Sequence, residues 1–425
     1  MTGVRQALAF AAVAAALSLA GCGGGRSTSI VGPPPAVTSP ASMQGNVQPI
    51  QVNTGPTAQA GDYAYTNGAF TSITLCAPGT GTCQTIGGIL VDTGSVGLRV
   101  LSSTLTISLP QQTQGGNAVG ECYPFPGAVT WGSVETADVE MAGEKAGSVP
   151  IEVIGGTGSF SAAPPPSCTA MGTPEQNLSE LHANGILGIG SFAQDCGLGC
   201  AASGASNVGY YYSCSSSGCQ ATPEDPADQV ANPVADFSTD NNGVAIELPA
   251  ITSSPPVASA VNGSLIFGIG TESNNQLTGV TVYEADPNTA NISTVFKGVS
   301  YTGVAFLDSG SSANFIADPT TTNMPICSRY MVYCPSAAVN FSATNVGATG
   351  TSGSFTFTVD NADNLLTQDA GNAAFGDLAG PSTTTAGPSK YDFFDWGLPF
   401  FYGRTVFTAI EGRSTPAGPG PYYAY

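Results

Sequence analysis

The sequence of 425 residues is poor in charge, and basic residues are scarcest. Lys and Arg total 9 against 29 Asp and Glu, so the net charge is −20. A surface with this balance repels phosphate backbones, which excludes nucleic acid as a partner. Charged residues make up 9% of the chain, whereas there are 55 Gly and 31 Pro. This composition disfavours long surface helices and favours short strands joined by many turns.

Histidine is almost absent, because His182 is the single one. A Ser-His-Asp hydrolase would have to use it, and the chain has no G-x-S-x-G motif for the nucleophile. The H-E-x-x-H motif of zinc proteases needs two histidines and is impossible. We expect His182 to be a surface or helix-capping residue. No metal and no cofactor are predicted, and carboxylates, hydroxyls and thiols remain as catalytic groups.

Long apolar runs are missing after the first twenty residues, so no transmembrane helix is predicted. Arg5 followed by the apolar run 7–20 is typical of an export signal. The run ends in Leu-Ala-Gly-Cys22, which resembles the lipobox of bacterial lipoproteins, where cleavage precedes the cysteine and the cysteine carries the lipid. We predict a lipoprotein signal peptide at 1–21 and lipidation of Cys22. The alternative is a plain secretory peptide with a chance cysteine.

Residues 22–48 are small, polar and rich in proline, which predicts a flexible tether behind the lipid. The residue after Cys22 is Gly23 rather than Asp. In the lipoprotein family this pattern implies sorting to the outer membrane. We therefore expect a monomer in the cell envelope of a Gram-negative bacterium, attached to the membrane only by its lipid anchor.

Ten of the 11 cysteines remain once Cys22 is assigned to the lipid. An even number in an oxidising compartment predicts disulfide bonds. Sequence proximity suggests two small loops and one longer one, closed by Cys76–Cys83, Cys327–Cys334 and Cys122–Cys168. The other four can form two bridges in any of three pairings, or a zinc site that an exported protein disfavours: Cys196, Cys200, Cys214 and Cys219.

An internal repeat organises the remainder of the chain. Residues 88–95 read GILVDTGS, and residues 303–311 read GVAFLDSGS. In each copy a short apolar strand runs into Asp, a hydroxyl residue, Gly and Ser, and the glycine permits a tight turn with the carboxylate at its tip. One copy would be weak evidence, because many strands end in such a turn. Two copies place one carboxylate, Asp92 or Asp308, in each half.

The repeat resembles the two D-[ST]-G motifs of the pepsin-like aspartic proteases, in which each lobe donates one copy. Further stretches match that family in its order: NGILGIG at 184–190, NGSLIFG at 262–268, and WGLPFF at 396–401 followed by TVF at 405–407. The resemblance spans about residues 69–410. The lipoprotein form is also similar to an uncharacterised bacterial domain-of-unknown-function family.

The resemblance makes Asp92 and Asp308 the catalytic candidates. Two carboxylates about 3 Å apart cannot both ionise cheaply and share one proton. The ionised one takes a proton from a water, and the protonated one donates to the peptide carbonyl oxygen. The hydroxyls at positions 93 and 309 are expected to bond the opposite loop, and those at 95 and 311 their own aspartate. The supporting residues are Thr93, Gly94, Ser95, Ser309, Gly310 and Ser311.

The chain departs from the family pattern near the flap, the hairpin that covers the cleft. Pepsins have a tryptophan that hydrogen-bonds a flap tyrosine, and Arg99 stands in its place. The flap lacks the usual Tyr-Gly-x-Gly-Ser but still reads as a hairpin around a Pro/Gly turn. Tyr123 is the candidate flap tyrosine, and Phe125 and Trp131 compete with it, although core packing is the commoner fate of each. A pairing of Arg99 with Glu121 is possible but not favoured.

The sequence thus predicts an all-β, bilobal pepsin-like fold with a cleft between two β-barrel-like lobes, at 49–240 and 241–425. The leading hypothesis is a lipid-anchored aspartic endopeptidase acting on a peptide or protein substrate. The alternative is a catalytically inactive pepsin-like lipoprotein with a binding or structural role in the cell envelope. The altered flap and the lack of a basic prosegment favour the alternative, and the two complete D-[ST]-G-S motifs favour the enzyme.

Overall fold

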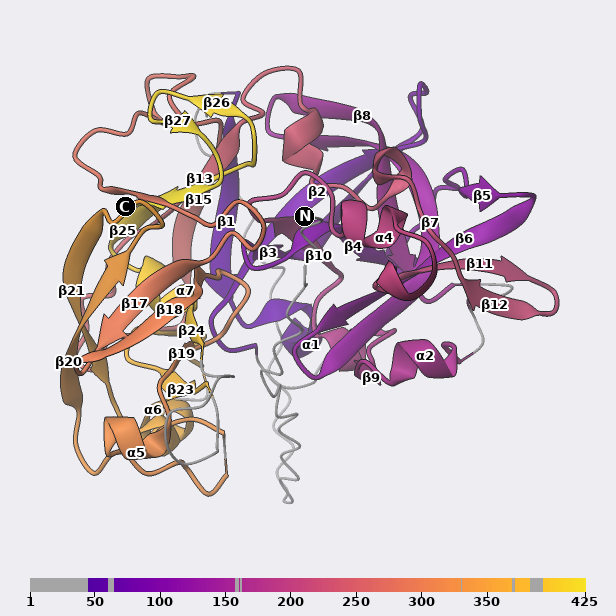
Figure 1. Ribbon diagram of the computed structural model, residues 1–425. Coiled ribbons are helices and arrows are strands. Elements are labelled where there is room, and N and C mark those ends of the chain that lie inside the picture. Colours follow the sequence, from indigo (N-terminus) through magenta and orange to yellow (C-terminus); the bar gives the residue numbers. More distant parts are fainter. Residues whose placement is uncertain are drawn as a thin grey trace, which may run out of the picture.

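The computed structural model describes residues 45–59, 65–156, 160, 163–329, 331–368, 371–382 and 393–425. The predicted signal peptide, Cys22 and most of the predicted tether lie outside these ranges. Inside them, no helix is both long enough and apolar enough to cross a bilayer. In Figure 1 the early strands, in indigo and purple, and the late strands, in orange, form two bodies on either side of a shared central region.

Strands far outweigh helices, which confirms the all-β prediction. The largest sheet has 17 strands and draws them from both halves of the chain. These strands are β1 (Val47–Asn53), β2 (Gly68–Cys76), β3 (Cys83–Asp92), β4 (Val96–Leu101), β5 (Thr113–Gln114), β6 (Asn117–Phe125), β7 (Ala128–Met141), β8 (Glu144–Ile154), β9 (Thr173–Pro174), β10 (Gly185–Ile189), β11 (Tyr211–Ser215), β12 (Gly218–Ala221), β13 (Gly243–Leu248), β15 (Val261–Phe267), β16 (Val282–Glu284), β25 (Arg404–Ala409) and β28 (Tyr422–Ala424).

The second main sheet has seven strands, all from the second half: β17 (Ile292–Phe296), β18 (Val299–Leu307), β19 (Asn314–Ile316), β20 (Val339–Val346), β21 (Ser352–Val359), β23 (Ala379–Pro381) and β24 (Phe394–Trp396). Two small ribbons pair β14 (Val257–Ala258) with β22 (Ala374–Phe375), and β26 (Ser414–Thr415) with β27 (Gly418–Pro419).

The α-helices are short, as the Gly- and Pro-rich composition predicts. They are α1 (Gly55–Gln59), α2 (Pro166–Thr169), α3 (Leu178–Leu181), α4 (Leu198–Ala201), α5 (Pro319–Thr322), α6 (Ala362–Gln368) and α7 (Leu398–Phe401). Helix α3 begins at the Asn177 side chain, which accepts hydrogen bonds from two backbone N–H groups, and ends at His182 in the left-handed conformation. The capping role predicted for His182 is therefore confirmed.

The sequence repeat is also a repeat of strand topology. In the first half β3 pairs in parallel with β10, β10 pairs antiparallel with β4, and β4 pairs in parallel with β8. In the second half β18 pairs in parallel with β24, β24 antiparallel with β19, and β19 in parallel with β23. Each aspartate motif therefore occupies the same turn in its half, between β3 and β4 or between β18 and β19.

Strand β1 connects the two halves. It pairs antiparallel with β2 on one side and with β15 on the other, where Val47 lies opposite Ile266 and Val52 opposite Val261. Strand β13 then pairs with both β15 and β25. Backbone hydrogen bonds between early and late strands therefore fix the two halves relative to each other.

Apolar side chains bury the strands that carry the motifs. Ile89 and Val91 on β3 are fully buried in the main core. Below the second motif the packing is aromatic, since the ring of Trp396 lies 5.3 Å from that of Phe394 and 5.7 Å from that of Phe400. Burial of several aromatic side chains in tilted ring contacts stabilises this part of the second half strongly.

The ten cysteines of the described chain form five disulfide bonds. The structure contains the three predicted bridges, Cys76–Cys83, Cys122–Cys168 and Cys327–Cys334. The four-cysteine cluster pairs neighbours, as Cys196–Cys200 and Cys214–Cys219, so none of its sulfurs is a thiolate able to bind zinc. The bridge Cys122–Cys168 spans 46 positions, so it restricts the unfolded chain most.

Candidate active site

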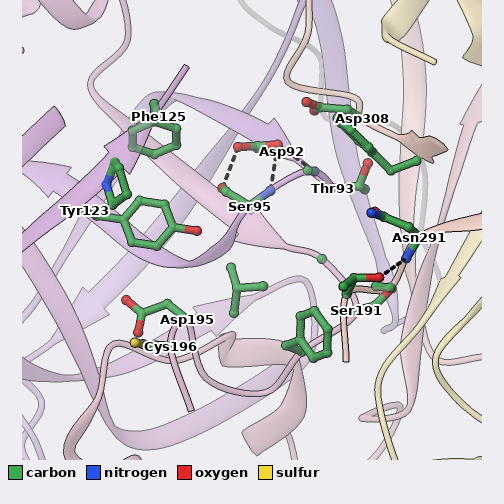
Figure 2. Close-up of a pocket in the computed structure, with 18 of the residues that line it drawn as sticks. Asp92, Thr93, Ser95, Tyr123, Phe125, Ser191, Asp195, Cys196, Asn291 and Asp308 are labelled. Carbon is green, nitrogen blue, oxygen red and sulfur yellow. Dashed lines mark hydrogen bonds between the residues drawn. The ribbon is translucent and has the colours of Figure 1, made fainter. Parts of the chain in front are cut away.

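The two aspartates lie at the ends of two strands. Asp92 is the last residue of β3, and Asp308 directly follows β18. Asp92 is buried and Asp308 is half-buried. Both line one pocket, and Figure 2 shows them on the same side of it. Because β3 and β18 are flanked by strands on both sides, their ends are rigid points from which to present a carboxylate.

Hydrogen bonds in both directions join the two turns. The hydroxyl of Thr93 donates to the carbonyl oxygen of Leu307 at 3.0 Å and accepts from the N–H of Ser309 at 2.9 Å. The hydroxyl of Ser309 donates to the carbonyl oxygen of Val91 at 2.8 Å and accepts from the N–H of Thr93 at 3.1 Å. Both hydroxyls are buried. Removing either would leave buried backbone groups of the opposite turn without a partner.

The Asp92 turn holds its own carboxylate. Oδ1 of Asp92 accepts from the N–H groups of Gly94 at 2.8 Å and Ser95 at 3.2 Å. Oδ2 accepts from the hydroxyl of Ser95 at 2.5 Å. Three donors on one carboxyl group fix its orientation.

The Asp308 turn repeats this arrangement. Oδ1 of Asp308 accepts from the N–H groups of Gly310 at 2.7 Å and Ser311 at 3.2 Å, and Oδ2 accepts from the hydroxyl of Ser311 at 3.0 Å. The two carboxyl groups therefore have equivalent partners within their own turns. Any difference between them has to come from residues outside the two motifs.

Glycine is required in each turn because the opposite carboxyl group approaches it closely. A Cβ atom on Gly94 would lie 2.4 Å from the carboxyl carbon of Asp308. A Cβ atom on Gly310 would lie 2.6 Å from Oδ1 of Asp92. Neither distance is compatible with a side chain. The glycine of each motif thus makes room for the aspartate of the other.

The carboxyl groups of Asp92 and Asp308 each lie against the glycine of the opposite motif, so the two groups are close together. Burial raises the pKa of Asp308 well above its usual range, and the charges of Asp92 and then Asp395 add to the shift. The carboxyl group of Asp308 is therefore harder to ionise than that of an exposed aspartate.

The cleft around the pair has a volume of about 270 Å³ and is lined from both halves. The first half contributes residues 92–96, 123–126 and 190–192, and the second half contributes residues 288–291 with Phe306 and Phe393. At about 30 Å³ per molecule, this space holds several waters.

A hairpin of β6 and β7 borders the cleft, as the sequence predicts. Phe125 pairs with Ala128, which leaves Pro-Gly at 126–127 as the turn. Tyr123 and Phe125 line the pocket, and Figure 2 shows their rings across it from Asp308. Trp131 instead is fully buried, with its ring 5.3 Å from that of Tyr212. Trp131 is thus a core residue, whereas Tyr123 and Phe125 are placed where a flap would contact a ligand.

Arg99 lies under this hairpin, fully buried. Its guanidinium lies 3.6 Å from the centre of the Tyr123 ring and makes ion pairs with Glu121 at 2.9 Å, Asp195 at 2.7 Å and Glu152 at 3.1 Å. The pairing with Glu121, which the sequence does not favour, is therefore present. The prediction was wrong because a buried cation needs several partners, and the other two carboxyl groups stand far from Arg99 along the chain.

Two carboxyl groups in this cluster, those of Glu152 and Asp195, are harder to ionise than exposed carboxyl groups. Burial raises the pKa of Glu152 and of Asp195 well above their usual range, the Glu121 charge adds to both shifts, and Arg99 opposes them. One cation cannot balance three anions in a buried site, so protonation is the remaining way to lower the charge.

Sequence reasoning missed a third carboxyl group beside the pair. Asp395 on β24 is 2% exposed, lines the cleft, and accepts from the Ser311 hydroxyl at 2.5 Å. It lies directly before the segment matched to the closing motif. A comparison of the two copies of the repeat could have found it, because the equivalent position of the first copy holds Ile186.

Among solved structures, the crystal structure of an aspartic proteinase from Irpex lacteus is similar to this chain, with a TM-score of 0.52 and 14% sequence identity. The match covers 89% of this chain and 96% of that chain. The predicted bilobal pepsin-like fold is therefore confirmed. Among curated proteins there is no match. The family model described as "Protein of unknown function (DUF3443)" covers residues 42–425, and the chain belongs to this family.

Proposed function

We propose that the protein is an aspartic endopeptidase that hydrolyses peptide bonds on the acid side of neutral pH. The observation that carries this proposal is the reciprocal hydrogen bonding that sets Asp92 and Asp308 against each other in the cleft. The carboxyl groups are oriented by hydrogen bonds from backbone N–H groups and serine hydroxyls, and the two glycines leave room for them. A pair held in this way is suited to general acid–base chemistry.

In the proposed reaction the ionised Asp92 takes a proton from a water, whose oxygen attacks the peptide carbonyl carbon. The proton on Asp308 passes to the carbonyl oxygen, so the tetrahedral intermediate is neutral. In the second step the proton now on Asp92 passes to the amide nitrogen, and the C–N bond breaks. A hydroxyl of the intermediate returns its proton to Asp308, which restores the starting state with an acid and an amine as products.

The alternative is a pepsin-like protein that binds a partner and cleaves nothing. The observation in its favour is the flap, where Tyr123 packs on the buried Arg99 instead of on a tryptophan. In this alternative the carboxyl pair would be a structural link between the halves. It predicts no cleavage at any pH.

The test is digestion of an unfolded polypeptide mixture by the full-length protein in mild detergent between about pH 3 and 7. We expect cleavage with a bell-shaped pH profile, because the mechanism needs one ionised and one protonated carboxyl group. A statine-type inhibitor, whose hydroxyl mimics the tetrahedral intermediate, should block it. If the protein cleaves nothing in this range and does not bind the inhibitor, the binding-protein alternative holds.

We further propose that the protein is anchored in the cell envelope through a lipid on Cys22. The support is the lipobox-like sequence before this residue and the polar tether after it. Labelled fatty acid should be incorporated into the wild type and not into Cys22→Ser, and the variant should keep its cleavage activity because the site lies in the folded halves. Equal labelling of the two proteins would contradict the anchor.

A further inference from the structure

The two copies of the repeat differ at one position beside the carboxyl pair. In β10, Ile186 pairs with the residue that stands two positions before Asp92. In β24, Asp395 pairs with the residue that stands two positions before Asp308. Strand topology makes these positions equivalent, so an apolar side chain of the first half is replaced by a carboxylic acid in the second.

Asp395 is held against the pair through one hydroxyl. The Oγ atom of Ser311 lies 2.5 Å from Oδ2 of Asp395 and 3.0 Å from Oδ2 of Asp308. Within the part of the chain that the structure describes, the hydroxyl of the equivalent Ser95 bonds one carboxyl group, that of Asp92. The other oxygen of Asp395, Oδ1, is buried and has no hydrogen-bond partner within the described residues. Burying a carboxyl group in this way is costly, so a contribution to the site would account for it.

Oδ2 of Asp395, Oγ of Ser311 and Oδ2 of Asp308 form a hydrogen-bonded chain, and the number of hydrogens in it couples the two carboxyl groups. Ser311 has one hydroxyl hydrogen for two acceptors. When Asp395 is protonated, it donates to Ser311, and Ser311 donates to Asp308, which favours the ionised form of Asp308. When Asp395 is ionised, Ser311 turns to Asp395, and Asp308 fills the vacant contact by donating its own proton to Ser311. The protonation states of Asp395 and Asp308 are thus opposed.

We propose that Asp395 is a positioning residue that acts through Ser311 to keep a proton on Asp308, so that the pair stays singly protonated over a wider pH range than two aspartates alone allow. This inference rests on the proposed endopeptidase function. It assigns a role to a carboxyl group of the cleft whose equivalent in the first half is the apolar Ile186.

The direction of the effect follows from the surrounding groups. In the described chain the titratable groups that interact with Asp395 are Asp308, Asp92 and Tyr423. Burial raises the pKa of Asp395 well above its usual range, so at low pH it is neutral and leaves the Ser311 hydrogen to Asp308, as a variant without this carboxyl group also does. As the pH rises, Asp395 ionises. Its negative charge then disfavours a second charge on Asp308, and the Ser311 hydroxyl donates its hydrogen to Asp395 instead of to Asp308. Both effects favour the protonated form of Asp308. Asp395 therefore shifts the basic limb of the pH–activity profile to higher pH and leaves the acid limb where it is.

The first test is the pH profile of kcat/KM for the wild type and two variants. Asp395→Asn keeps a neutral hydrogen-bonding group, and Asp395→Ile copies the first half. In both, the basic limb should move to lower pH by about one unit, the size expected for loss of a nearby like charge, with the acid limb unchanged. Asp377→Asn is the matched control, because Asp377 is a half-buried carboxyl group outside the cleft with its pKa raised to about 6 by burial and Asp360. An unmoved basic limb, or equal movement of both limbs, would overturn the proposal.

The second test needs no cleavage. The folded protein holds a proton on Asp395 that the unfolded chain has released, so stability falls as pH rises above the ordinary Asp range. Thermal unfolding at several pH values should show that Asp395→Asn reduces this loss of stability with rising pH. The reduction should be smaller in an Asp308→Asn background, because residue 308 then no longer titrates and cannot be coupled to Asp395. Additive effects would overturn the coupling. If the wild type cleaves nothing at any pH, the endopeptidase function fails and this cycle alone decides the proposal.

Discussion

Replacing either Asp92 or Asp308 by Asn is expected to abolish peptide cleavage and leave the fold intact. Asn has the same shape as Asp and still accepts the backbone N–H bonds, but it neither takes nor gives the proton that the reaction moves. We expect kcat/KM at the optimal pH to fall by about 10³-fold or more, because positioned acid–base groups contribute on the order of 10²–10⁴ each. Initial rates on a cleaved peptide measure the loss, and thermal unfolding measures the fold.

The double variant should be no less active than either single variant, because the two groups act as one device. Asp377→Asn again serves as the control for loss of a half-buried carboxyl group, and it should keep wild-type rates. Wild-type cleavage by either Asp92→Asn or Asp308→Asn would show that the water is activated elsewhere. Loss of activity together with loss of the folded state would require the Asp→Glu variants to separate chemistry from stability.

The second large effect is expected at Arg99. Replacing it by Met, which has a similar apolar stem, removes the one cation shared by Glu121, Glu152 and Asp195. Removal of one partner from a buried ion pair typically destabilises a protein by about 3–5 kcal/mol. We expect a loss of this size at neutral pH, measured by chemical denaturation.

The loss should be much smaller in acid. Burial raises the pKa of Glu152 and of Asp195, so the folded protein holds protons there that the unfolded chain releases, and stability falls as pH rises from the ordinary carboxyl range toward the folded values. Without Arg99 the fall becomes steeper. Arg404→Met is the control, because Arg404 stacks 4.4 Å from the centre of the Phe400 ring and has no ion pair in the described chain. A loss at Arg99→Met that is equal at about pH 3 and pH 7 would contradict this account.

The fold and the carboxyl pair could be predicted from sequence because their signals are local and repeated. Each motif combines an apolar strand, an aspartate and a glycine within nine residues or fewer, and the two copies indicate that the chain folds as two similar halves. The close contacts at Gly94 and Gly310 explain why the motif tolerates little change. Three of the five disulfides could be predicted, including Cys122–Cys168, whereas the sequence left open the pairing of the four-cysteine cluster that the structure shows as Cys196–Cys200 and Cys214–Cys219.

The charged surroundings of the site could not be predicted in the same way. Arg99 contacts Asp195 across 96 positions, and Ser311 contacts Asp395 across 84. A comparison of the two copies of the repeat could single out Asp395, but its contact with Ser311 and that of Arg99 with Asp195 follow only from strand pairing. For Arg99 the sequence indicated only that a cation had replaced a tryptophan. Its burial, which makes several acidic partners necessary, is a property of the packed hairpin.

The position of strand β1 has a mechanical consequence. Its neighbours β2 and β15 occupy both of its edges, and their hydrogen bonds run across the strand direction. A force applied to the chain before Val47 therefore acts along β1. It loads the hydrogen bonds on both edges of β1 at the same time, in shear, and does not break them one after another. Under tension from that end the two halves would stay joined, because β1 is hydrogen-bonded to a strand of each half.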